Sequence, residues 1–210
     1  LRGQNVIAPS LSITDGEFVN VGVDVDTVYC VNKRTVNSAT KYYVEALNDD
    51  NTTDSAILLS GGSKPSTTSV TGLSHLEGKT VKVIVDDAMQ SDKTVSSGGI
   101  TLDAVPTTYV EIGIDYTPTI KTMPVELKLP SGNIIGQKKR IVDATALVYL
   151  SQNLTLDAKD FAFTAAQFFT GKKRRKPMLG YDREGQLTFS QSAPLFFTLL
   201  GIEYKVSVGQ

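Results

Sequence analysis

Hydrophobic and polar residues alternate with a period of two in several short runs of this chain, which is the pattern of β-strands. In the central stretch, residues 73–102, valine occupies every second position from 81 to 85. Asp86-Asp87 and Gly98-Gly99 interrupt the alternation with turn-forming residues. The stretch therefore predicts a compact unit of three short strands, the second near residues 93–95 and the third at 100–102.

The clearest hairpin is predicted earlier in the chain. The runs VYCVNKRT and ATKYYVEAL are rich in β-forming residues and are joined around Val36-Asn37-Ser38. Asparagine tolerates the left-handed conformation that a tight turn needs. The period of two places Val28, Cys30 and Asn32 on one face of the first strand.

The C-terminal half predicts longer strands. Residues 139–151, KRIVDATALVYLS, alternate as a long strand, although the apolar run 144–150 also fits a helix. Residues 160–169, DFAFTAAQFF, are the best candidate for a short helical turn. Two closing strands are expected at 186–191 and 195–208.

These patterns predict an all-β, mainly antiparallel fold with a β-sandwich or barrel-like scaffold. Gly61-Gly62-Ser63-Lys64-Pro65-Ser66 has the composition of a linker. We expect residues 1–66 and 107–210 to form the scaffold, and residues 67–106 to form a small β-barrel module inserted into it.

Composition bounds the class of protein. Hydrophobic residues make up 40% and charged residues 20% of the 210 residues, as in folded globular proteins. No apolar run reaches the roughly 20 residues of a membrane-spanning helix, so no membrane-spanning segment is expected. The chain begins with Leu1, so a preceding segment or processing is expected.

The near-zero net charge hides a segregation. Residues 1–120 carry 8 basic and 15 acidic residues, whereas residues 121–183 carry 12 basic and 5 acidic residues. Such a division can orient a molecule against a partner or against copies of itself.

Candidate catalytic residues are few. His75 is the only histidine and Cys30 the only cysteine, and each has an ordinary structural role as its simplest interpretation. The aspartate groups lack the spacing of a calcium loop, and no phosphate-binding glycine motif is present. We therefore expect no catalytic residue, no metal site, no cofactor and no small-molecule substrate.

The sharpest charge feature is the run Lys172, Lys173, Arg174, Arg175 and Lys176, with a weaker echo at Lys138, Lys139 and Arg140. Three interpretations stay open: a solvated loop, contact with an acidic protein surface such as that of a neighbouring copy, and non-specific contact with a DNA backbone. No aromatic stacking platform or recognition helix surrounds the run, so sequence-specific DNA reading is not expected.

Several ordered motifs resemble a known family. VYCVNKRTVNSATKYYVEAL, VTGLSHLEGKTVKVIVDD with TVSSGGITL, VEIGIDYTPTIKTMPVEL and GYDREGQLTFSQSAPLFFTLLGIEYKVSVG resemble the C-terminal region of structural proteins of tailed bacteriophages, of the tail nozzle or tail hub type. LSHLEGKTVKV is also similar to a small β-barrel module in the first catalytic-cysteine half-domain of ubiquitin-activating enzymes. Phe196-Phe197 and the KKRRK run depart from the family pattern.

The resemblance implies a structural virion protein of the phage tail, made in the bacterial cytoplasm. Its expected partners are copies of itself and neighbouring tail proteins, packed symmetrically around the DNA passage. The alternatives are a receptor- or carbohydrate-binding tail module, which the absence of tryptophan disfavours, and a tail-associated hydrolase, in which a Ser-His-Asp or Cys-His arrangement would have to use His75.

Overall fold

The computed structural model describes residues 11–48, 50–126, 128–129, 132–133, 136–176 and 180–209. Nearly all their regular structure is β-strand, and the strand pairs are antiparallel. The predicted all-β, mainly antiparallel fold is confirmed. The sheets are open and none of those described closes into a barrel, so the barrel form expected for the module and scaffold is not found.

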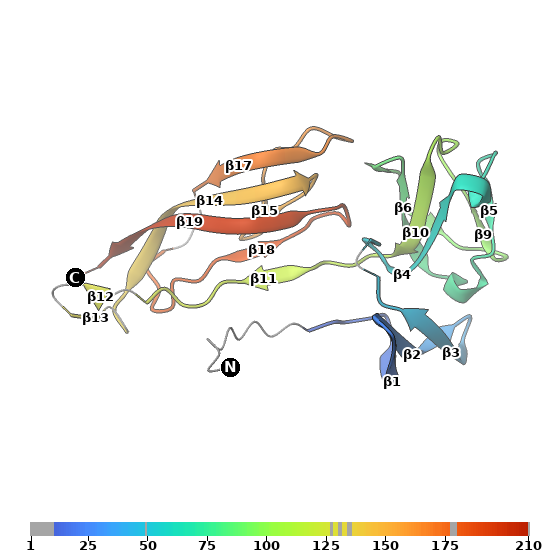
Figure 1. Ribbon diagram of the computed structural model, residues 1–210, viewed down its shortest axis with the longest axis horizontal. Helices are drawn as coiled ribbons and strands as arrows, with labels where there is room; N and C mark the ends of the chain where they lie inside the picture. The colour runs from blue at the N-terminus through green and yellow to red at the C-terminus, as the bar shows by residue number, and fades with distance from the viewer. Residues whose placement is uncertain are drawn as a thin grey trace.

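Three parts follow one another along the chain (Figure 1). The first, which we call the N-terminal sheet, has the strand order β1-β2-β3. Its strands are β1 (Glu17–Asp24), β2 (Thr27–Val36) and β3 (Ala39–Ala46).

The predicted hairpin is the connection between β2 and β3. Asn37 and Ser38 have φ angles of 49° and 61°, which is the left-handed conformation that a two-residue hairpin turn requires. The expected face is also found, since Cys30 and Asn32 are buried and Val28 is half-buried.

The second part, the middle unit, is built on the sheet order β4-β10-β6-β7, with β8 also paired to β6 and a separate β5-β9 pair. Eleven buried apolar residues form its core, among them Val81, Val83 and Val85. The predicted alternation is therefore confirmed. The strands are β4 (Asp54–Ser60), β5 (Ser69–Thr71), β6 (Thr80–Val85), β7 (Ala88–Met89), β8 (Lys93–Thr94), β9 (Gly99–Thr101) and β10 (Tyr109–Ile114), with short 3-10 helices at Gly61–Ser63 and Ser74–Leu76.

The sheet of the middle unit extends beyond the expected module, residues 67–106. Both β4 and β10 lie outside those bounds, yet β10 pairs with β4 on one side and β6 on the other. Ile57, Leu59, Val110 and Ile112 pack in or against the same core. The packing unit thus runs from about β4 to β10, and an independent module at 67–106 stays a prediction.

The third part, the C-terminal sandwich, packs the sheet β11-β18-β15-β16 against the sheet β17-β14-β19. Residues of both sheets form one core, including Ile141, Val148, Leu156 and Phe189. The strands are β11 (Thr119–Lys121), β12 (Lys128–Leu129), β13 (Gly132–Asn133), β14 (Lys139–Ser151), β15 (Thr155–Leu156), β16 (Lys159–Asp160), β17 (Phe169–Arg175), β18 (Thr188–Ser190) and β19 (Thr198–Val208).

The long strand predicted at 139–151 is β14, so the helical alternative for 144–150 is wrong. The helical turn predicted for 160–169 is also wrong, because this segment connects β16 to β17 without a helix. Phe161 is buried and Phe163 packs against the same core. Residues two positions apart lie on the same side of the backbone only when the chain is extended. Packing of both phenylalanines in the core therefore overrides the local preference for a helical turn.

Candidate functional site: a basic edge strand and an uncovered sheet

The basic run lies mainly in a strand and not in the loop that was the first interpretation. Four of its five residues belong to β17, which is an edge strand of the sheet β17-β14-β19. Exposed and half-buried positions alternate along it: Lys172, Arg174 and Lys176 are exposed, whereas Lys173 and Arg175 are half-buried. Strand pairing therefore divides the run between two faces.

The outward cations of β17 meet acidic side chains of the same sheet. Arg174 donates from Nε to Asp143 Oδ2 at 2.6 Å and donates a second hydrogen bond to the same oxygen. This arrangement lowers the pKa of Asp143, chiefly through the hydrogen bond from Arg174. Lys172 Nζ lies 3.6 Å from Glu203 Oε2, and both side chains are well exposed. The exposed Lys172–Glu203 pair contributes little to stability, whereas the Arg174 pair holds a buried carboxylate.

Lys173 points toward the sandwich interior. Its ammonium lies 4.1 Å from the ring centroid of Phe169 and 4.6 Å from that of Phe163, and it donates to the Ala162 carbonyl at 2.5 Å. The two rings pack edge to face at 6.2 Å. An inward charge on an edge strand hinders pairing with another strand, so Lys173 protects this edge.

The second basic group separates into exposed and buried residues. Lys138 and Arg140 are exposed, but Lys139 is only 1% exposed and donates to the Val125 carbonyl at 2.5 Å. Its backbone also exchanges two hydrogen bonds with Asp182. Lys139 is therefore a structural residue, which corrects its grouping with the contact residues.

The exposed cations gather at one end of the molecule. Lys205 is paired with Asp143 in the β14–β19 ladder. Lys176 lies close by, because it directly follows Arg175, which is paired with Ala144 in the β14–β17 ladder. Figure 1 places this end, where β14 begins and β17 and β19 finish, far from the middle unit. Lys138, Arg140, Lys176 and Lys205 form what we call the basic end.

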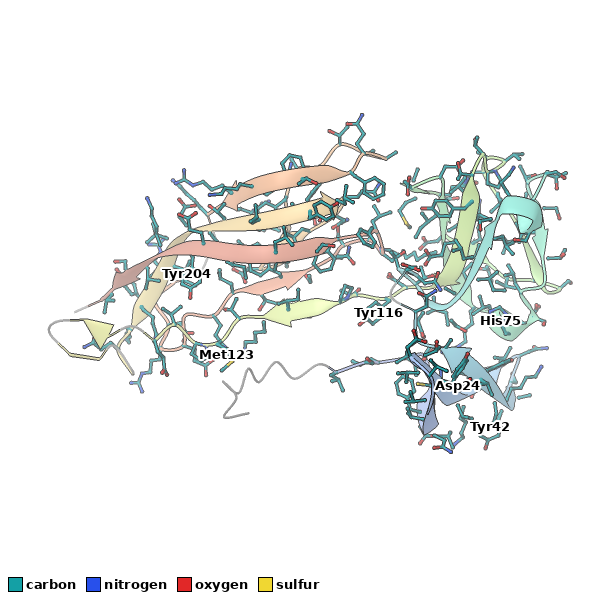
Figure 2. The ribbon with its side chains drawn as sticks, viewed as in Figure 1. Asp24, Tyr42, His75, Tyr116, Met123 and Tyr204 are labelled. Atoms are coloured by element: carbon teal, nitrogen blue, oxygen red, sulfur yellow. The ribbon has the colours of Figure 1, made fainter. Side chains whose placement is uncertain are left out.

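In contrast to the basic end, the N-terminal sheet has an exposed apolar surface. Directly paired residues of antiparallel strands share a face, and the pairs are Val31 with Val44 and Lys33 with Tyr42. Tyr29 lies on this outer face as well. Val44 is 73% exposed and Tyr42 is 61% exposed, so this face has no second sheet over it. Figure 2 shows Tyr42 on the side of the sheet away from His75.

Strand β1 adds an open edge to this surface. All eight of its residues are exposed, and it pairs only with β2 among the described strands. Val21 and Val23 are more than half exposed, and their pairing with Cys30 and Val28 places them on the face opposite Tyr42 and Val44. Unpaired backbone groups beside exposed valines favour the addition of a further strand or partner.

Polar contacts attach the N-terminal sheet to the middle unit. The Arg34 side chain is 1% exposed and forms ion pairs with Glu45 and Asp54. It also donates to the Asp15 carbonyl and to Ser55 Oγ, both at 2.8 Å. Burial opposes the charge of Glu45, but hydrogen bonds from Arg34 and Asn32 outweigh it, and the pKa of Glu45 is lowered. We call these residues the Arg34 cluster.

The candidate catalytic residues occupy structural positions. A ring nitrogen of His75 lies 3.2 Å from the Ser55 carbonyl oxygen, and its ring packs edge-on to Tyr43. Cys30 is a buried free thiol on the inner face of β2. Within the described residues, no group of His, Cys, Asp and Glu has the arrangement of a metal site.

Sequence reasoning did not single out the Arg34 cluster or the outer face. Both could have been predicted from the alternation of side chains along β2. Arg34 follows Cys30 and Asn32 at inward positions of β2, and Tyr29 and Val31 make the other face of the same strand apolar. A strand with apolar residues on both faces indicates contacts on both sides.

The chain was compared with known proteins. No protein-family model matches it, and a search of curated proteins finds no match. No helix in the described part of the chain is long and apolar enough to cross a membrane.

Proposed function

We propose that this chain is a structural subunit of a bacteriophage tail, of the nozzle or hub type, which binds copies of itself and neighbouring tail proteins around the DNA passage. The ordered motifs that resemble this family support the proposal. The all-β antiparallel architecture is compatible with it.

The observation that carries an assembly role is the uncovered N-terminal sheet. Tyr29, Val31, Tyr42 and Val44 present apolar surface on one face, and β1 leaves an edge open beside it. Contiguous exposed apolar surface is costly in water and commonly marks an interface. Tyrosine and valine side chains of this kind would be covered by a partner in the assembled tail.

Charge favours a second copy as one of the partners. The basic end carries Lys138, Arg140, Lys176 and Lys205, whereas residues 1–120 have a clear acidic excess. Contact between unlike surfaces of identical chains is heterologous, and it generates rings when the rotation closes. The basic end of one copy would therefore lie on the acidic N-terminal half of the next.

Solution mass at low and high salt tests this proposal. We expect the purified chain to form oligomers at low salt that weaken at about 1 M salt, where the Debye length falls to about 3 Å. Val44→Lys should weaken association further, because it places a charge on the outer face. Thr101→Lys is the control, since Thr101 is an exposed strand position of the middle unit. A monomer at every concentration and salt level would contradict self-assembly.

Location in the virion is the second measurement. Electron microscopy with an antibody against this chain should label the tail. Labelling confined to the capsid, or absent from purified virions, would overturn the proposal of a tail subunit.

A further inference from the structure

A cavity of about 390 Å³ lies between the middle unit and the C-terminal sandwich. Its floor is the face of the middle sheet that points away from the Val81–Val83–Val85 core. In that sheet Glu111 is paired directly with Leu58 on β4 and with Ile84 on β6, so the three side chains form a row on one face. A carboxylate thus stands between two aliphatic residues.

The opposite wall comes from the C-terminal sandwich. It is mainly apolar, with Leu150, Phe168, Leu195 and Phe196 among its residues. Gln152 joins the two walls, because its Nε2 donates to the Asp87 carbonyl at 2.9 Å. The cavity is therefore assembled from elements distant in sequence and has a fixed hydrogen bond across its rim.

Glu111 is the central polar group of this cavity. It is only 3% exposed. Its Oε1 accepts hydrogen bonds from the backbone N–H groups of Thr52 and Thr53, both at 2.8 Å, and from their hydroxyls at 3.2 and 2.7 Å. Its Oε2 accepts no hydrogen bond from the described residues. When one oxygen of a buried carboxylate accepts four hydrogen bonds and the other accepts none from the described residues, a cationic donor is favoured at the second oxygen.

The remaining polar groups do not neutralise this charge. Tyr109 donates to Asp87 Oδ1 at 2.7 Å, and burial together with this bond raises the pKa of Tyr109, so the phenol stays a neutral donor. Asp50, Asp87 and Glu111 line the cavity, and none of the described lining residues is Lys, Arg or His. The cavity is apolar in its walls and negative in its charge.

We propose that this cavity binds an alkylammonium group, with the ammonium at Glu111 and the alkyl chain against Leu58, Phe168 and Phe196. Its volume falls in the range of small-ligand pockets. A carboxylate ligand would meet uncompensated like charge, and a neutral alkyl chain would leave Glu111 Oε2 without a donor. The phenylalanine rings supply apolar surface for the alkyl chain.

Titration of the full chain with n-hexylammonium tests the proposal, followed by calorimetry and by NMR shifts of residues on both walls. Hexanoate and hexanol are the matched probes of opposite and zero charge. A second titration uses Nα-acetyl-lysine amide, which represents the lysine side chain of a polypeptide. Tighter binding of the free amine identifies a small-molecule ligand, and tighter binding of the lysine derivative identifies a polypeptide side chain as the source.

We expect n-hexylammonium to bind more tightly than both matched probes, and Glu111→Gln to weaken it about tenfold or more, as for loss of a charged hydrogen-bond partner. Because Glu111→Gln alters a buried group, Phe196→Ala serves as a second variant that removes one wall and should also weaken binding. Asp92→Asn is the control, since Asp92 pairs with Lys82 in the same unit and does not line the cavity. Equal binding of all three probes, or equal binding by the wild type and both cavity variants, would overturn the proposal.

Discussion

The N-terminal sheet and the sheet β17-β14-β19 have the same number of strands but differ in what covers them. A second sheet covers the inner face of β17-β14-β19, and the core between them contains Ile141, Val148 and Phe189. The N-terminal sheet has no second sheet over its outer face, where Tyr42 and Val44 are exposed.

The two sheets therefore differ in the forces that hold them in place. Hydrophobic burial holds the C-terminal sandwich together. Polar contacts hold the N-terminal sheet to the middle unit, among them those of the buried Arg34 with Glu45, Asp54 and the hydroxyl of Ser55. An attachment of this kind specifies orientation and leaves the apolar face free for a partner.

The edge strands of the two sheets also differ in how far they are protected from pairing with another strand. Strand β17 carries inward charge at Lys173, which hinders strand addition. Strand β1 carries exposed valines and pairs on one side only among the described strands. One edge is protected in the monomer, whereas the other is open to association.

The largest expected effect is loss of core packing in the sandwich. Phe189→Ala should lower the free energy of unfolding by about 3–5 kcal/mol, because Phe189 is fully buried between the two sheets. Urea denaturation measures this change. Tyr42→Ala is the matched control on the uncovered sheet and should change the stability of the monomer by less than about 0.5 kcal/mol. A similar loss for both variants would mean that the two sheets are equally covered.

Removal of Arg34 should release the N-terminal sheet. Arg34→Ala leaves Glu45 and Asp54 without their cation, and loss of one partner of a buried pair costs about 3 kcal/mol or more. Hydrogen exchange should accelerate in β1, β2 and β3 and stay unchanged in the middle unit. The control is Lys33→Ala, which breaks only the exposed pair with Glu17. Uniform acceleration across all three parts would contradict a local attachment.

Acid should weaken the same attachment. The pKa of Glu45 is lowered from its ordinary value near 4.5, so its stabilising charge is complete above that pH and is lost as the pH falls through the lowered pKa. NMR spectra recorded during an acid titration should show the N-terminal sheet loosening. Glu45→Gln should reduce this acid dependence, and an unchanged titration in that variant would assign it to other carboxylates.

Salt should act mainly on the sandwich surface. The pKa of Asp143 is also lowered, chiefly by its hydrogen bond from the exposed Arg174. Because the Arg174 side chain is well exposed although Asp143 is buried, ions screen this pair, and about 1 M salt should raise the pKa of Asp143 toward its ordinary value. The pKa of Glu45 should respond less, since its partner Arg34 is buried. NMR titration of both carboxyl groups at two salt concentrations measures the difference.

The smallest expected effect on stability comes from Lys173. Lys173→Met removes the ammonium from the two phenylalanine rings at a cost of about 0.5–1 kcal/mol. It should also make the β17 edge more similar to that of β1, and therefore increase self-association measured by solution mass. Lys172→Met is the control, since it removes one charge from the outward face of the same strand and is not part of the basic end. Equal association of the two variants would show that the inward position of Lys173 does not protect the edge.

Local sequence predicted the features that depend on neighbouring residues. The Asn37-Ser38 turn, the alternation of Val81, Val83 and Val85, and the long strand β14 were all predicted from short segments. The helical turn at 160–169 was not found, because Phe161 and Phe163 pack in the sandwich core and hold the chain extended.

The candidate sites divide in the same way. The basic run was visible as a sequence feature, but its division into outward Arg174 and inward Lys173 depends on pairing with β14. Lys139 looked equivalent to its neighbours and is buried. The cavity at Glu111 had no sequence signal, since its walls come from separate parts of the chain.

The sequence alone determined the strand periodicity, the tight turns and the division of charge along the chain. Only the tertiary structure decided which apolar faces are covered, which cations are buried and that Glu111 and the phenylalanines of another unit line one cavity. The physical reason is that period and turn chemistry act between residues close in the chain, whereas burial depends on segments brought together by the fold.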